Sequence, residues 1–174
     1  MARSSITPTG KEAFFGEEEI IVSKTDLTGR ITYANDVFLK VAGYTEKELL
    51  GTAHSVIRHP DMPRCVFKLL WDTIQSGNEI FAYVVNLCKN GDHYWVLAHV
   101  TPTFDNHGTI VGYHSNRRVP ERAAVKAASD LYRMLLDEEK KYDRKEEATL
   151  ASTSTMLNLL AKNDIAYEEF VWTL

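Results

Sequence analysis

Apolar and β-branched positions alternate with turn sequences near the start of the chain. Residues 19–23 (EIIVS) and 30–33 (RITY) are separated by DLTG at 26–29. Strand-forming residues on both sides of a short connection that holds Asp and Gly predict a β-hairpin. The first two elements of the chain are therefore expected to be paired antiparallel strands.

The pattern then changes to helical spacing. Asn35 precedes a short apolar run and is a candidate N-cap, and TEKE at 45–48 has the spacing of a capping box. Residues 65–75 carry apolar side chains at the spacing of an α-helix, which is expected to stop at Gly77. A run of short helices is predicted between the two strand regions.

Three more strands are predicted over 79–88, 93–104 and 109–119, where aromatic and β-branched residues predominate. The connections between them are turn sequences, and the Asn-Gly pair at 90–91 is the strongest of these hairpin signals. Two strands, several short helices and three strands indicate an α+β fold. We expect a five-stranded antiparallel sheet with short helices over one face and room for a ligand between them.

Helix breakers vanish from the last third of the chain. All nine Gly and all five Pro precede position 121, and apolar residues then recur at heptad-like spacing. This pattern predicts two helices with a break near 149–155, where Ser and Thr lower helix propensity. They are expected to pack on the domain, on each other or on another chain, which leaves a homodimer open. The predicted organisation is an N-terminal arm (1–16) docked through Phe14 and Phe15, a compact α+β domain (17–119) and a helical extension (120–174).

Composition narrows the function classes. The chain is 44% hydrophobic and 25% charged, with a formal net charge of -4 and no long basic run. These values argue against binding to nucleic acid or to an anionic membrane surface. No apolar run has the length of a transmembrane helix, and the first residues do not resemble a signal peptide. Cys65 and Cys88 form no disulfide framework, so we expect a soluble cytoplasmic protein.

The motifs of common enzymes are missing from the sequence. It contains no GxGxxG, P-loop, GxSxG or HExxH sequence, and its six histidines are scattered. We therefore expect neither catalytic residues nor a metal site. One segment does concentrate polar chemistry, because Arg58, His59 and Asp61 lie in the proline-stiffened connector RHPDMP ahead of a predicted helix. Such an Arg can bind phosphates, and Asp61 can accept from ribose or adenine, although Arg58 and Asp61 pairing with each other is the alternative.

Several strings together resemble a known family. They are SKTDLTGRITYAN at 23–35, GTAH at 51–54, RHPDMP at 58–63, KNGDHYWV at 89–96 and VTP at 100–102. Residues 20–119 resemble a PAS domain, and specifically the aerotaxis-receptor (Aer) and CetB-like group of energy-taxis sensors. The resemblance implies a PAS fold that binds FAD non-covalently, responds to the redox state of FAD and passes the signal to a chemoreceptor module.

The same resemblance implies particular cofactor contacts. It assigns the FAD-associated motif to Arg58, His59 and Asp61, and the adenosine end to His54 and Trp71. It places the amides of Asn35 and Asn86 near the isoalloxazine, to which an amide offers both a donor and an acceptor. Phe67 and Tyr94 are implied as pocket walls. Core packing for Trp71 and a surface position for Asn86 are the structural alternatives.

Two departures from the family pattern bear on the cofactor. His99 stands where the family usually has Asn, and Phe81 stands where many members have Trp. A histidine at the flavin edge can titrate near neutral pH. The departures keep two alternatives open, namely a haem-binding PAS domain with His59, His99 or His114 as the ligand, and a cofactor-free dimerisation module.

The expected output is a partner in trans. The sequence shows neither a transmembrane segment nor a long signalling coiled coil. The resemblance therefore implies a separate membrane chemoreceptor as the partner, with the chain itself cytoplasmic or held at the membrane periphery through that receptor.

Overall fold

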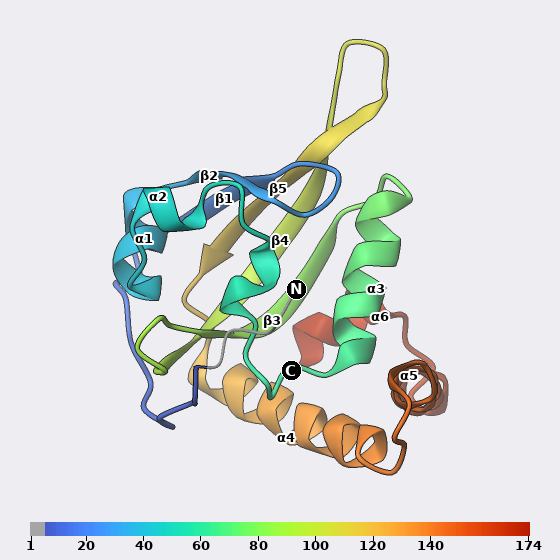
Figure 1. Cartoon of the computed structure of the whole chain (residues 1–174). Coiled ribbons are helices and arrows are strands. Elements are labelled where there is room, and N and C mark those ends of the chain that lie inside the picture. Colours follow the sequence, from blue (N-terminus) through green and yellow to red (C-terminus); the bar gives the residue numbers. More distant parts are fainter. Residues whose placement is uncertain (1–5) are drawn as a thin grey trace.

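A computed structural model describes residues 6–174, and its centre is one antiparallel sheet (Figure 1). The sheet runs in the order β2-β1-β5-β4-β3, so the first hairpin lies beside the last strand. The strands are β1 (Ile21–Thr25), β2 (Ile31–Ala34), β3 (Ile80–Leu87), β4 (His93–Phe104) and β5 (Ile110–Arg118). All neighbouring pairs are antiparallel. This confirms the five-stranded α+β fold predicted from the alternating pattern.

Four short helical segments cover one face of the sheet, as predicted (Figure 1). They are α1 (Asp36–Ala42), α2 (Glu46–Leu49), the 3₁₀ turn η1 (His54–Ile57) and α3 (Arg64–Gln75). Asn35 caps α1 by accepting from the Phe38 N–H at 3.1 Å, and a capping box of Thr45 and Glu48 starts α2. The caps satisfy backbone groups that such short helices would otherwise leave exposed.

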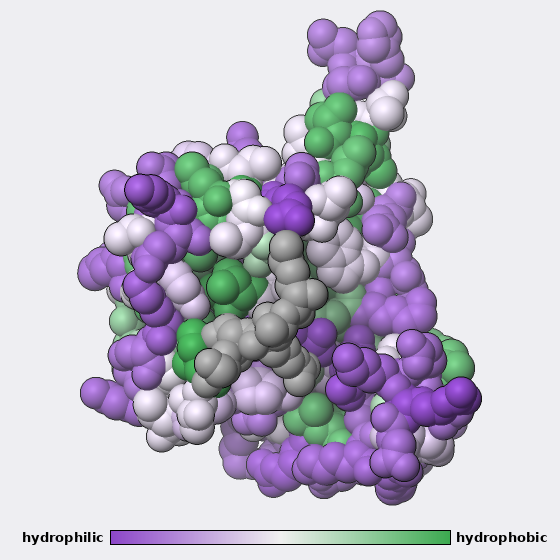
Figure 2. All heavy atoms as spheres, viewed as in Figure 1, coloured by the Kyte–Doolittle hydropathy of each residue, from purple (hydrophilic) through white to green (hydrophobic). Residues whose placement is uncertain are grey.

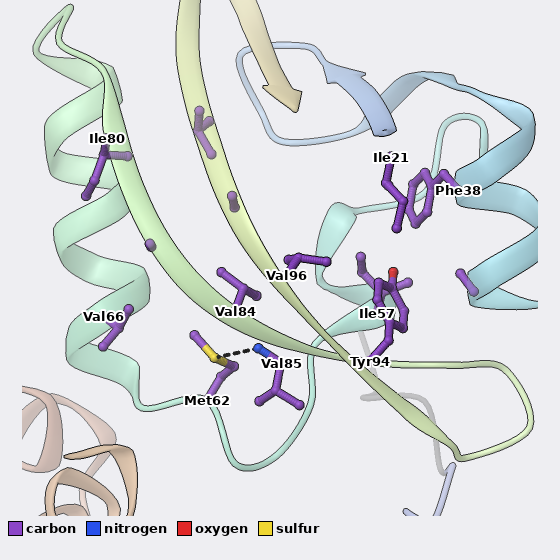
Figure 3. Packing of buried hydrophobic residues seen from close by; sticks show 14 of the residues in the cluster. Ile21, Phe38, Ile57, Met62, Val66, Ile80, Val84, Val85, Tyr94 and Val96 are labelled. Atoms are coloured by element: carbon purple, nitrogen blue, oxygen red, sulfur yellow. Dashed lines mark hydrogen bonds between the residues drawn. The ribbon is translucent and has the colours of Figure 1, made fainter. Parts of the chain in front are cut away.

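The alternation along β4 divides the core between two faces of the sheet. Tyr94, Val96 and Ala98 are buried on the face beneath the helices, which we call the inner face. Trp95 and Leu97 point to the opposite, outer face and pack against the C-terminal helices. Figure 3 shows buried side chains of the core, with Val66 and Ile80 beside α3 and Ile21 and Phe38 grouped at the α1 end.

The C-terminal residues form a helical layer that contacts both the outer face and α3. Its elements are α4 (Arg122–Glu139), α5 (Lys145–Lys162), α6 (Tyr167–Phe170) and the 3₁₀ turn η2 (Val171–Thr173). Ala124 and Ala128 of α4 pack on Tyr83 of β3, whereas α5 packs on α3 and α4. The outward surface of this layer is largely hydrophilic in Figure 2.

The predicted helix break near 149–155 is wrong, because these residues lie inside α5. The hydroxyls of Thr149, Thr153 and Thr155 each donate to the carbonyl four residues earlier, at 2.7–3.1 Å. Their polar groups are thus satisfied within the helix. The chain instead turns at residues 140–144.

Two tyrosines of the helical layer close the free edge of β3. The Tyr132 hydroxyl donates to the Tyr83 carbonyl at 2.5 Å, and the Tyr167 hydroxyl donates to the Phe81 carbonyl at 3.0 Å. An edge strand presents unpaired backbone groups that can recruit other strands. The extension satisfies two of them.

The N-terminal arm runs along the start of β4. The Ala13 N–H donates to the His93 carbonyl at 2.7 Å, and Glu12 forms a two-pronged ion pair with Arg122 of α4. Phe15 packs against the core, whereas Phe14 is 73% exposed. The arm therefore joins the sheet to α4. Residues 1–5 of the predicted arm lie outside the described residues.

The described helices do not include one that is long and apolar enough to cross a bilayer.

The hairpin of β4 and β5 projects beyond the body of the molecule and carries a hydrophobic patch (Figure 2), to which Phe104 and Val111 contribute.

Candidate functional site

A cavity of about 420 Å³ lies between α3, η1 and the inner face of the sheet. Its volume falls within the roughly 300–1,000 Å³ of small-molecule sites. The predicted site residues that line it are His54, Arg58, Phe67, Trp71 and Asn86. The described lining residues include the cations Arg58, Lys68 and Arg117 but no Asp or Glu. The cavity therefore combines apolar walls with positive charge.

Arg117 of β5 is the most unusual group in the cavity. It is 2% exposed, its guanidinium lies 4.4 Å from the centre of the Phe38 ring, and Nη2 donates to Ser23 Oγ at 2.5 Å. Nε and Nη1 have no acceptor within the part of the chain that the structure describes. Burial lowers the pKa of Arg117 to about 10, so the group stays charged at neutral pH. A buried cation with spare donors calls for a ligand that brings acceptors.

His54 and Ser23 form a polar cluster with this arginine. His54 Nε2 lies 3.3 Å from Ser23 Oγ, which already accepts from Arg117. Burial, with a smaller contribution from the charge of Arg117, lowers the pKa of His54 to about 3, and the imidazole is neutral at physiological pH.

Asn86 and Arg58 meet at the end of the cavity near β3. A backbone bridge pairs the two residues, and Asn86 is 3% exposed. Its Nδ2 has no acceptor among residues 6–174. The Arg58 guanidinium lies over the Phe67 ring at 4.2 Å and donates to the Met62 carbonyl at 3.2 Å. The Asn86 amide is thus buried and offers hydrogen bonds to the cavity.

Trp71 forms an aromatic wall together with Tyr113. The two rings meet edge to face, with centroids 5.5 Å apart. A Cβ at Gly29 would lie 2.9 Å from the Trp71 ring, and Gly29 has a φ of 77°. Glycine at this turn therefore lets the indole approach the β1–β2 hairpin.

Five predicted contacts are not among the described residues lining this cavity, and Asn35 and Tyr94 are two of them. The Asn35 side chain is occupied by the backbone, since it accepts from Val22 and Phe38 and donates to Ile20. Tyr94 lies in the core beside the cavity, and burial raises its pKa.

His99 faces the other side of the sheet. It stacks on Phe81 with ring centroids 4.2 Å apart and contacts Glu79 at 2.6 Å. The alternation of β4 explains this placement, because His99 is one residue out of step with Ala98 and Val100.

His59 and Asp61 line a second cavity, beside α4. His59 is buried, whereas the Asp61 side chain is 73% exposed and lies 3.6 Å from His59 Nδ1. Of the connector motif, only Arg58 borders the first cavity.

Sequence reasoning missed Arg117 and Ser23. Both lie on strands at positions that alternate inward, and β-strand pairing sets Ser23 opposite Ser115, two residues from Arg117. The available signal was a charged residue at an inward position of a predicted strand, which is rarely left buried without a role. The described residues contain no cluster of three or more His, Cys, Asp or Glu that could hold a metal ion.

Comparison with solved structures supports the architecture. The dark structure of the blue-light photoreceptor Aureochrome1 LOV matches with a TM-score of 0.57 and 24% identity, over 66% of this chain and 85% of that one. This likeness concerns the fold.

Two curated proteins are similar in sequence. The aerotaxis receptor of Escherichia coli (strain K12) is 42% identical over 119 residues, which are 68% of this chain and 23% of the receptor. The nitrogen fixation regulatory protein of Klebsiella pneumoniae is 26% identical over 102 residues, 59% of this chain and 21% of that protein. The chain thus spans less than a quarter of either relative.

The model of the PAS fold family matches residues 31–117, which is half of the 174 residues. The match starts at β2 and ends at Arg117, and so includes every predicted site residue that lines the first cavity. The sheet order, the helices over one face and the 42% identity to the aerotaxis receptor agree with it. The chain belongs to the PAS fold family.

Proposed function

We propose that the chain is a flavin-binding PAS redox sensor for energy taxis, and that it signals to a separate chemoreceptor-type partner. The observation that carries the proposal is the first cavity, whose described lining has no acidic residue and in which Arg117 and Asn86 hold buried donors without an acceptor among residues 6–174. Flavin rings present carbonyl and ring-nitrogen acceptors along one polar edge, and FAD adds an anionic pyrophosphate. The similarity to the aerotaxis receptor supports the choice of signal.

The residues present fit such a ligand. Arg117 and Asn86 would donate to the polar edge of the ring system, while Phe67 and Trp71 would cover its apolar surface. Arg58 and Lys68 would bind the phosphates. The proposed contacts do not depend on Asn35 and His99, which the sequence analysis predicted as further contacts.

When bound, flavin supplies reversible reduction coupled to proton uptake. The chain would have to accommodate the resulting change between acceptor and donor at the ligand edge, and a rotation of the Asn86 amide would do so by exchanging its Nδ2 for its Oδ1. Two buried donors left facing each other would cost about 1–3 kcal/mol. A bias of this size shifts a two-state equilibrium by about 5–150-fold. Asn86 lies on β3, whose edge is bonded to the extension through Tyr132 and Tyr167, so β3 is the proposed route of the signal.

The geometry removes two of the three histidines considered as haem ligands from the first cavity. Of the three histidines considered as haem ligands, His59 lines the second cavity and His99 faces the outer side of the sheet. His114 borders the first cavity and is the haem candidate that the absorption spectrum has to exclude.

The test is the absorption spectrum of the purified full chain, followed by extraction and identification of the cofactor. A flavin spectrum that bleaches with dithionite and returns in air is the expected result. A Soret band would establish the haem alternative. A protein that stays colourless after incubation with FAD would leave a cofactor-free dimerisation module as the remaining alternative. For the partner, co-purification with a chemoreceptor from membranes is expected to depend on the redox state, and equal recovery in both states would contradict the proposed output.

A further inference from the structure

The middle of α5 lacks the charges that cover the other long helix of the extension. Residues 148–161 include no Asp, Glu, Lys or Arg. On α4, by contrast, Lys126, Asp130 and Arg133 form exposed ion pairs on the solvent side. A helix face that stays in water is normally rich in charged residues. The composition of α5 is therefore that of a helix covered on both sides.

Two leucines make the outward face of α5 apolar. Leu150 is 64% exposed and Leu157 is 56% exposed, and Ser154 and Ala161 belong to the same exposed row. Their spacing of four, three and four residues is that of a coiled-coil seam. The opposite side of α5 already packs on α3 and α4, and Figure 1 shows α5 end-on at the edge of the molecule. The leucines therefore form a strip of their own and are not scattered surface positions.

The polar groups beside this strip are already satisfied. The hydroxyls of Thr149, Thr153 and Thr155 donate to carbonyls of their own helix. Covering them strands no donor, which would otherwise cost about 1–3 kcal/mol. The described residues that line the first and second cavities include none from α5. The outward face of α5 is therefore separate from the cofactor site and suited to burial.

The charges of α5 lie at its two ends and have opposite signs. Glu146 and Glu147 are in its first turn, and Lys162 is in its last. If two copies of α5 paired in the same direction, like charges would meet at both ends. In an antiparallel pair, the acidic end of each helix lies against Lys162 of the other copy. Such electrostatic complementarity fixes the partner and the orientation. The pattern is complementary to itself, which favours a second copy of the chain as the occupant.

We propose that the outward face of α5 pairs antiparallel with α5 of a second copy, about a two-fold axis near Ser154. Residue 154 is the midpoint between Glu146 and Lys162. Leu150 of each copy then lies beside Leu157 of the other, as in an interface that uses the same patch twice. The helix has 18 residues. Its length is about 27 Å. A contact of this size is small beside the roughly 1,200–2,000 Å² of stable interfaces, so the dimer is expected to dissociate reversibly.

The first test is sedimentation velocity of the full chain over concentrations of about 1–500 µM. A reversible monomer–dimer equilibrium is expected. Leu150→Ser/Leu157→Ser is expected to raise the Kd of the dimer at least about tenfold, because the dimer loses four leucine side chains. The matched control is Phe104→Ser/Val111→Ser, which removes the exposed apolar pair of the β4–β5 hairpin and should leave the Kd unchanged.

Cross-linking locates the axis and the direction of the pair. In Ser154→Cys the two new thiols meet at the axis, so mild oxidation is expected to give a disulfide-linked dimer. Ala161→Cys lies on the same face, but in an antiparallel pair its two thiols are about 21 Å apart along the helices and should stay unlinked. The native Cys65 and Cys88 are buried and do not compete.

Charge reversal tests the ends of the helix. Glu146→Lys/Glu147→Lys and Lys162→Glu are each expected to weaken the dimer when present alone, because like charges then meet in the antiparallel pair. An equimolar mixture of the two variants is expected to dimerise again, since each end then faces the opposite charge. Recovery on mixing also shows that both variants are folded.

Three results would overturn the proposal. The first is a chain that stays monomeric at the highest concentration, which would leave the face to a helix of another protein. The second is a dimer that the hairpin variant dissociates and the leucine variant does not. The third is equal cross-linking of Ser154→Cys and Ala161→Cys, which would indicate a parallel pair. None of these measurements needs a bound flavin, so the dimer and the flavin proposal can fail separately.

Discussion

Arg117 is a buried cation without a carboxylate partner in the described chain, held by Ser23 and by the face of Phe38. Burying a charge without compensation is costly, and replacing such a charge by an apolar side chain often stabilises a protein. The retention of an arginine here makes sense if a ligand completes its hydrogen bonds. The residue should then favour binding at the expense of stability.

Arg117→Met separates these two effects. The free energy of unfolding of the flavin-free variant is expected to exceed that of the native chain by about 1–4 kcal/mol. The variant is also expected to bind FAD at least about tenfold more weakly. Chemical denaturation and flavin titration measure the two quantities. Arg118→Met, at the next and exposed position, is the control and should change neither. An Arg117→Met variant with native flavin affinity would contradict the assignment of this residue to the ligand.

His54 makes the stability depend on pH in a predictable direction. Its folded-state pKa is about 3, against an ordinary value of 6.5, so below pH 6.5 the unfolded chain binds a proton that the folded chain refuses. The contribution of His54 to stability is therefore fully present above pH 6.5 and is lost as the pH falls toward 3. The slope from this one group is at most about 1.4 kcal/mol per pH unit.

The measurement compares urea unfolding of the native chain and His54→Gln at about pH 7.5 and about pH 5. Stability of the native chain should fall more steeply between the two. Carboxylates that titrate in the same range are common to both proteins and cancel in the comparison. Parallel pH profiles would show that His54 binds a proton in the folded chain as readily as in the unfolded chain, and would contradict its lowered pKa.

At the level of elements, the first turn of α3 joins the cavity to the extension. Glu139 of α4 is 3% exposed and accepts from the Arg64 backbone N–H at 2.6 Å, from the Arg64 guanidinium at 2.8 Å and from Ser152 of α5 at 3.0 Å. A carboxylate at a helix N-terminus satisfies an unpaired N–H and interacts favourably with the helix dipole. One side chain thus connects three helices.

Glu139→Gln is expected to lower the free energy of unfolding by about 1–3 kcal/mol, because the amide keeps the shape but loses the charge that Arg64 and the helix terminus compensate. Thermal or urea unfolding measures the loss. Asp137→Asn, two residues earlier on the same helix but exposed, is the control and should have little effect. Equal stability of both variants would show that the buried contacts contribute nothing beyond packing.

The elements themselves were predictable because their signals are local. The alternation in 93–104 and the turn at 90–91 predicted β4 and its hairpin correctly, and Asn35 caps α1 as expected. The break at 149–155 was not predictable from propensity, because the threonines of α5 bond to their own helix backbone. Tertiary packing on α3 and α4 then overrides weak propensity.

The face of the sheet on which a residue lies was harder to predict from the sequence than the strand to which the residue belongs. The family pattern associated His99 with the flavin, but strict alternation in β4 sends it to the outer face, toward Phe81. Arg117 was overlooked because a charged residue near a strand end is usually solvated. In both cases the missing information was the pairing of distant strands, such as β1 with β5, which no local pattern contains.

At the scale of the whole molecule, the helical extension and the sheet form one structural unit. The extension covers the apolar outer face at Tyr83 and Trp95, and its tyrosines close the β3 edge. A chain without residues 121–174 would expose both the apolar face and two backbone carbonyls of an edge strand. Exposed edges of this kind pair with each other.

We therefore expect the fragment 1–120 to self-associate and to unfold more readily than the full chain. Light scattering after size exclusion measures the association, and thermal unfolding measures the stability. Tyr167→Phe in the full chain is the matched probe of the edge alone, since it removes only the hydroxyl bonded to the Phe81 carbonyl. It should cost about 1 kcal/mol without association. A monodisperse fragment with the melting temperature of the full chain would mean that the extension is a separate appendage, and the route from Asn86 through the β3 edge would then lose its physical basis.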